Sequence, residues 1–254
     1  MRQRYQVREG IVIRRHELPS GDVIVTLLDE RGKWRGRAKK GKQLGGNLGR
    51  LSLFHDVTLQ HYGRSDEELN VITQVQLNGA LPGLSAPSVY PYAHLLAELS
   101  DRLSGDVHVG EGFYSYLASG LRGLAQHPDP AAVAVVYAWK LIAQAGLSPR
   151  LTRCAVCGQN PPGEHFDAAA GGLSCASCAR GFRLPAAVVA DLLRVHGRSV
   201  REALETPLAD LADHWALLGR YLAYHVGEVQ SLRGLARLST LEPAPDPYSG
   251  LQRE

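Results

Sequence analysis

The sequence predicts an α+β protein in which a small β-barrel is followed by a helical domain with a metal-binding insertion. Two observations on periodicity and one motif lead to this prediction. Residues 1–80 contain short stretches with apolar residues near every second position, whereas from residue 81 onward the apolar spacing becomes helical. Two C-x2-C pairs then interrupt the helical part within residues 149–183.

Five short strands are expected in the N-terminal part, separated by turns rich in Gly, Pro, Asp and Ser. They are expected at residues 5–15, 23–28, 33–38, 57–62 and 69–77. Five strands in about 75 residues suit a closed OB-like barrel of five strands, with an SH3-like barrel as the alternative that periodicity leaves open. We therefore assign residues 1–80 to an OB-fold domain that binds nucleic acid.

Helices are expected over most of the remaining chain. Asp129-Pro130 is a start signal, and Ser199 with Glu202 forms a capping-box pattern. The segment 131–145 is apolar on all sides, which predicts the buried centre of a bundle. Further helices are expected at residues 89–103, 113–124, 185–195 and 208–226. These assign residues 81–148 and 184–240 to the two parts of an α-helical domain and the Pro-rich residues 241–254 to a loose tail.

The insertion at residues 149–183 carries all four cysteines of the chain, Cys154, Cys157, Cys175 and Cys178. Two residues separate the members of each pair, so each pair can bind one side of a tetrahedral ion. We predict one structural Zn²⁺, because four thiolates leave no open position for catalysis. Two disulfides, a redox C-x-x-C pair, or His165 in place of one cysteine are the alternatives. The insertion is expected to be a small hairpin loop without a core of its own.

The positive charge of the chain is local. The whole chain has 28 basic and 25 acidic residues, but residues 1–80 have 14 against 9, and residues 31–55 have no acidic residue. Local positive charge attracts polyanions. The residues expected to bind DNA are Lys33, Arg35, Arg37, Lys39, Lys40, Lys42 and Arg50. On a strand, the first three share one face at spacings of about 7 Å, and Trp34 points to the opposite face as a core residue.

The basic residues of this segment allow two other interpretations, and a second basic cluster lies elsewhere in the chain. Residues 36–42 match the first seven positions of a phosphate-binding P-loop, but Gln43 stands where Ser or Thr should bind magnesium and no helix is expected to follow. A solvated basic turn is the plain alternative. A second, weaker cluster at Arg194, Arg198 and Arg201 is expected to be a solvated face more than part of a DNA track.

No pattern for catalysis or for a membrane is evident. HExxH and GxSxG patterns do not occur, and no pair of carboxylates stands out as general acid and base, so we expect no enzyme. The charged start at Met1 lacks a following apolar stretch, and the longest apolar run, residues 131–139, is shorter than the roughly 20 residues of a membrane span. We expect a soluble, cytoplasmic protein.

In domain order, the chain resembles the RecO family of bacterial recombination mediators. The resemblance rests on the strand at residues 25–29 leading to residues 35–41, on the element at residues 51–54 before residues 57–59, and on the C-x2-C pairs. It implies DNA repair by binding of single- and double-stranded DNA and strand annealing, in the RecFOR pathway. The implied partners are RecR, single-strand-binding protein and, indirectly, RecA, at the nucleoid. An RNA- or ribosome-associated module is the alternative; a DNA ligase fragment is a weaker one, because no Lys-x-Asp-Gly motif occurs.

Overall fold

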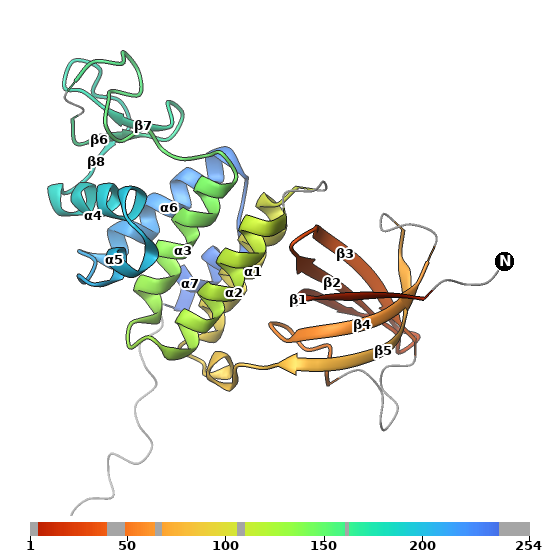
Figure 1. Ribbon diagram of the computed structural model, residues 1–254. Coiled ribbons are helices and arrows are strands. Elements are labelled where there is room, and N and C mark those ends of the chain that lie inside the picture. Colours follow the sequence, from red (N-terminus) through yellow and green to blue (C-terminus); the bar gives the residue numbers. More distant parts are fainter. Residues whose placement is uncertain (1–4, 40–48, 64–67, 106–109, 161–162, 239–254) are drawn as a thin grey trace, which may run out of the picture.

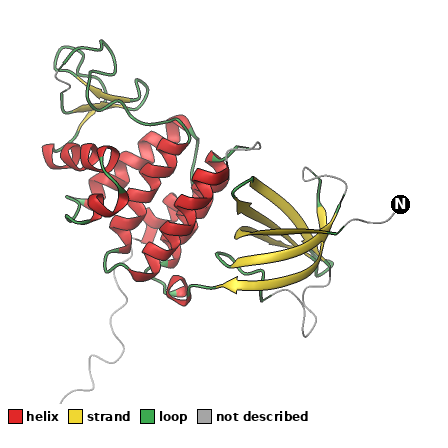
Figure 2. Cartoon of the chain, in the orientation of Figure 1, coloured by secondary structure: helices red, strands yellow, loops and turns green. Residues whose placement is uncertain are grey.

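The computed structural model describes residues 5–39, 49–63, 68–105, 110–160 and 163–238. A closed barrel and a small three-stranded sheet lie on opposite sides of a group of helices (Figure 1). Strands are confined to these two β structures, and helices fill the space between them (Figure 2). None of the helices within these residue ranges is long and apolar enough to cross a membrane.

The barrel has the strand order of an OB fold. Its strands are β1 (Gln6–Glu17), β2 (Val23–Asp29), β3 (Gly32–Ala38), β4 (Asp56–Tyr62) and β5 (Asn70–Gly79). They pair in the order β1-β2-β3-β5-β4, and β4 pairs back with β1 to close the barrel. The contact between β3 and β5 is parallel, and all other pairs are antiparallel. The expected OB-like barrel is therefore confirmed, and the SH3-like alternative is not needed.

Strand β1 connects the barrel core with the helices. Its apolar run supplies Val12 to the cluster inside the barrel, and Ile11 and Ile13 to the core shared with the helices. Successive side chains of a strand point to opposite faces, so Val12 faces the barrel interior while Ile11 and Ile13 face the helices. Leu28 of β2 joins the helical core in the same way. The barrel is thus packed against the helices through apolar contacts.

The helices form one bundle. A 3₁₀ turn, η1 (Pro82–Ser85), leads into them. They are α1 (Tyr90–Leu103), α2 (Gly110–Gln126), α3 (Pro130–Gln144), α4 (Ala186–Gly197), α5 (Val200–Leu204), α6 (Leu211–His225) and α7 (Gln230–Leu238). The capping box is present, because the Ser199 hydroxyl accepts from Glu202 N and the Glu202 carboxylate accepts from Ser199 N.

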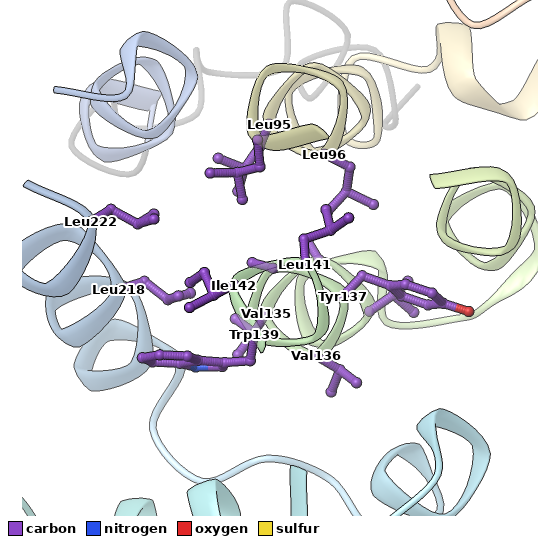
Figure 3. Close-up of a cluster of buried hydrophobic side chains, with 14 of the residues drawn as sticks. Leu95, Leu96, Val135, Val136, Tyr137, Trp139, Leu141, Ile142, Leu218 and Leu222 are labelled. Carbon is purple, nitrogen blue, oxygen red and sulfur yellow. The ribbon is translucent and has the colours of Figure 1, made fainter. Parts of the chain in front are cut away.

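Helix α3 is the buried centre of this bundle, as its all-round apolar sequence predicts. The Asp129 carboxylate accepts a hydrogen bond from Ala132 N at 2.9 Å and so begins the helix. Figure 3 shows α3 side chains directed to several neighbours at once, with Leu95 and Leu96 of α1 on one side and Leu218 and Leu222 of α6 on another. Such a helix is stabilised mainly by packing.

The glycines of α2 have a packing role. A Cβ atom on Gly120 would lie 2.8 Å from Leu96 Cδ1 and 3.2 Å from the Tyr137 ring, and one on Gly123 would lie 3.2 Å from Val133 Cγ1. Glycine lowers helix propensity by about 1 kcal/mol. Here it lets α2 approach both α1 and α3 closely.

The cysteine insertion contains short strands, and within the described residues it forms no apolar cluster of its own, as expected. It contains β6 (His165–Asp167), β7 (Gly172–Ser174) and β8 (Phe182–Arg183) in the order β7-β6-β8. Phe166 and Leu173 are fully buried and belong to the helical core. The Phe166 ring lies 5.7 Å from the ring of Tyr221 in α6. The insertion is therefore held partly by apolar contacts with the bundle.

Two helix predictions need correction. Helix α6 begins at Leu211 and not at residue 208, because the Asp210 carboxylate accepts from Ala212 N and serves as the cap. Helix α7 was not expected at all. Its first two N–H groups, those of Gln230 and Ser231, donate to the carboxylate of Glu98, which is remote in sequence. The expected tail at residues 241–254 lies outside the described residues.

Candidate nucleic-acid interface and metal centre

Strand β3 separates a charged outer row from a buried inner row. Lys33 and Arg37 are half-buried and Arg35 is exposed, whereas Trp34 is 1% exposed inside the barrel. The alternation and the core position of Trp34 are as predicted. A Cβ atom on Gly36 would lie 2.3 Å from Trp34 Cη2, so this glycine makes room for the indole. Because Gly36 has this place within a strand, it does not begin a phosphate-binding P-loop.

Two of the three outer cations of β3 already have acidic partners. The Lys33 ammonium lies 3.4 Å from Asp101 Oδ1 and donates to the Asp101 carbonyl at 2.8 Å. The Arg37 guanidinium donates to Asp22 Oδ2 through Nε at 2.8 Å and also through Nη2. These pairs cancel much of the charge that the sequence places in a row. They join β3 to the last turn of α1 and to the start of β2.

Arg35 and Lys39 carry the uncompensated charge of this face. Both are exposed, and neither has an ion pair or hydrogen bond within the described part of the chain. Cross-strand pairing extends the row from Arg35 through Thr26 to Arg14 on β1. The Arg14 side chain is 74% exposed and lies 3.2 Å from Asp101 Oδ2. Sequence reasoning missed Arg14, although the Arg14-Arg15 pair at the end of an apolar strand was a usable signal.

The connection between β3 and β4, called the basic loop below, carries the remaining predicted DNA-binding residues Lys40, Lys42 and Arg50. Arg50 is exposed, and its guanidinium donates to the Val75 carbonyl at 3.0 Å, which ties the end of the loop to β5. Lys40 and Lys42 lie outside the described residues. The weaker cluster is only partly available, because Arg194 pairs with Asp191 at 2.7 Å and donates to the carbonyls of residues 206 and 207.

The four cysteines come together as predicted. The sulfur atoms of Cys154, Cys157, Cys175 and Cys178 all lie within 4.8 Å of one another. The pair Cys157–Cys175 is 3.7 Å apart, and two sulfurs on a tetrahedral zinc ion are separated by about 3.8 Å. None of the four forms a disulfide, and His165 is not part of the group. These sulfurs could hold a metal ion.

The local backbone supports this arrangement. Gly158 directly follows the second cysteine and has φ 76°, a conformation that suits glycine. The N–H groups of Cys157 and Cys175 point to the Cys154 sulfur at 3.4 and 3.3 Å. These contacts turn the chain around a common centre.

The pKa values of two of the thiols are shifted in opposite directions. The backbone N–H groups of Cys157 and Cys175 lower the pKa of Cys154 to about 6, since they stabilise its thiolate. Hydrogen bonding to the sulfurs of Cys157 and Cys175 raises the pKa of Cys178 to about 12. Four adjacent thiolates repel one another, so they all become charged only around a positive ion.

Two family models match the chain in the order of its domains. The model described as recombination protein O N terminal matches residues 1–80, and the model described as recombination protein O C terminal matches residues 85–233. The chain belongs to the RecO family. The RecO match includes the barrel, the helices and the cysteine insertion, so the resemblance predicted from sequence is confirmed.

Similar proteins named DNA repair protein RecO extend this finding. The RecO of Anaeromyxobacter sp. (strain K) is 33% identical over 233 residues, which cover 86% of this chain and 90% of the relative. That of Anaeromyxobacter dehalogenans (strain 2CP-C) is 35% identical over 234 residues, with the same coverage. That of Thermobifida fusca (strain YX) is 33% identical over 242 residues, which cover 90% of this chain and 97% of the relative.

Proposed function

We propose that this chain is a DNA repair and recombination mediator that binds single- and double-stranded DNA and anneals complementary strands. Membership of the RecO family and relatives named as DNA repair proteins support this function. The observation that carries it is the outer face of β1–β3, where Arg35, Lys39 and Arg14 are exposed in a region with few uncompensated acids. In OB folds, the face of strands 2 and 3 commonly binds oligonucleotides.

The proposed mechanism is electrostatic. Cations on the barrel neutralise phosphates, which lowers the repulsion between two strands and lets base pairing select the product. Arg35 and Lys39 would contact phosphates directly, together with Lys40, Lys42 and Arg50 of the loop. Lys33 and Arg37 would contribute less, because Asp101 and Asp22 already balance their charge. No covalent chemistry is needed for this function.

We further propose that the four cysteines bind one structural Zn²⁺. Four cysteine sulfurs that lie within 4.8 Å of one another are the donor set that zinc prefers in structural sites. The ion would hold the ends of the insertion, while Phe166 and Leu173 attach it to the bundle. RecR, single-strand-binding protein and, indirectly, RecA are the partners that the family resemblance implies, at the bacterial nucleoid.

The test is an ATP-free annealing assay with a charge-matched control. Arg35→Glu/Lys39→Glu should slow annealing and weaken DNA binding at least tenfold, because both phosphate contacts become repulsive. Arg153→Glu/Arg180→Glu changes the net charge equally, at two exposed positions of the cysteine insertion, and should have a much smaller effect.

Two results would count against this function. Equal annealing by the two double variants would remove the barrel face as the site. Preference for RNA over DNA of equal length and sequence would favour the RNA-associated module instead.

A further inference from the structure

A cavity of about 520 Å³ lies where the barrel meets the helices. Its wall is formed by the end of β1, by residues 52–55, by the connection that includes η1, and by the first residue of α1. Pockets of this size commonly bind small molecules or parts of larger ligands. The side chains that matter here are Arg15, Ser52, Phe54, His55, Ser85 and Tyr90.

One side of the cavity is aromatic. Phe54 is nearly buried, and its ring packs edge-to-face on Tyr90 at a centroid distance of 5.8 Å. Phe54 has φ 67°, a strained conformation for a bulky residue. It is fixed by a hydrogen bond from Phe54 N to the Val12 carbonyl at 2.8 Å. Tyr90 is 42% exposed, so much of its surface is available to a ligand.

The polar groups of the cavity include both a donor and acceptors. Arg15 Nε is buried and has no hydrogen-bond partner among the described residues. The hydroxyls of Ser52 and Ser85 donate to the carbonyls of Gly49 and Pro82, which leaves their oxygen lone pairs as acceptors. His55 Nδ1 lies 3.1 Å from the Arg50 carbonyl and donates to it.

The charge and the position of the cavity indicate its ligand. Arg15 is the one charged residue among the described lining residues, and its guanidinium is paired with Glu17 at 2.7 Å. Because Glu17 already balances the charge of Arg15, the cavity suits an uncharged ring with donors and acceptors better than it suits an acidic peptide. The lining residue Ser52 follows Arg50, a predicted DNA-binding residue, by two positions.

We propose that this cavity binds one unstacked base of a DNA strand whose backbone contacts Arg50. The base would lie against Tyr90, and Arg15 Nε would donate to an acceptor on its edge. The inference rests on the proposed DNA-binding function and adds a base-binding subsite to it. Contact with an aromatic side chain tolerates any base, because every base has a π-face.

The experiment compares a thymidine oligonucleotide with an abasic oligonucleotide of equal length and charge. Tyr90→Leu should weaken binding of the thymidine strand about five- to tenfold and leave binding of the abasic strand unchanged. Arg15→Gln should act in the same direction. Tyr224→Leu is the matched control, because Tyr224 is 61% exposed on α6 and is not among the described lining residues of the cavity; this variant should bind both strands normally.

The outcomes separate this proposal from the proposed function. Variants at Tyr90 and Arg15 that bind both strands like wild type, or that weaken both equally, overturn the base subsite while DNA binding stands. Loss of binding of an acidic peptide by folded Tyr90→Leu, with both oligonucleotides unaffected, also overturns it and assigns the cavity to a protein partner. Wild type that binds neither oligonucleotide overturns both proposals.

Discussion

The barrel and the cysteine insertion are both small β structures, but different interactions stabilise them. The barrel strands close around an apolar cluster of their own, in which Trp34 is the largest side chain. The insertion has strands of two or three residues, and its buried Phe166 and Leu173 belong to the core of the helices. The barrel therefore has its stability encoded in an apolar pattern, whereas the insertion depends on its neighbour and on four converging sulfurs.

Removing two of the proposed metal ligands should have the largest effect, and this effect should be confined to the insertion. In Cys157→Ser/Cys178→Ser, two of four ligands are lost, and metal binding of this kind contributes about 10–16 kcal/mol in small zinc domains. We expect loss of bound zinc and fast amide hydrogen exchange in residues 163–183, with unchanged exchange in β1–β5. Ser177→Ala, in the same turn, is the control. Zinc retained at full stoichiometry in the cysteine variant would contradict the metal assignment.

Truncating the barrel core should destabilise the barrel and leave the proposed metal centre unchanged. Trp34→Ala removes a fully buried side chain and should lower the free energy of unfolding by about 3–5 kcal/mol. Urea denaturation followed by circular dichroism measures this loss, and zinc content should stay the same. Trp215→Ala serves for comparison: Trp215 is only half-buried against Tyr92, so its loss should cost less. Release of zinc from Trp34→Ala would show that the two regions are not independent.

The smallest effects are expected from alanine substitutions of two neighbouring cations of β3, which should change the salt dependence of DNA binding to different extents. Arg35→Ala should reduce the slope of log affinity against log salt by about 1 and leave stability unchanged, because Arg35 is exposed and without a partner in the described chain. Lys33→Ala should change the slope less and lower stability by up to about 1 kcal/mol, because it breaks the pair with Asp101. DNA titrations at several salt concentrations, together with denaturation curves, distinguish the two. Equal slopes for both variants would mean that the ion pair does not restrain Lys33.

Local patterns predicted most of the fold. Alternation gave the barrel strands, and all-round apolarity identified α3 as the centre, because both depend on which faces of an element are buried. Helix α7 was missed because its N-terminus is held by Glu98, a contact between residues far apart in the chain. The start of α6 was misplaced because Thr206-Pro207 resembles a cap, while its carbonyl groups bind Arg194 instead.

The candidate sites were predictable to different degrees. The cysteine spacing predicts the metal centre, since two short pairs can converge in only a few ways. The basic loop identifies a charged face, but the partners of Lys33 and Arg37 lie on α1 and at the start of β2, beyond the reach of a local pattern. The cavity beside Arg15 and Tyr90 has no sequence signature, because its walls come from separate segments that only folding brings together.

The carboxylate of Asp101 couples the tumbling of the barrel to that of the helices. It contacts Arg14 on β1 and Lys33 on β3 at the same time, from the last turn of α1. Rotation of the barrel about the short connection between β5 and α1 would break both contacts together, along with the packing of Ile11, Ile13 and Leu28. Barrel and bundle should therefore share one rotational correlation time, so a strand bound on the barrel is presented at a fixed angle to the helices.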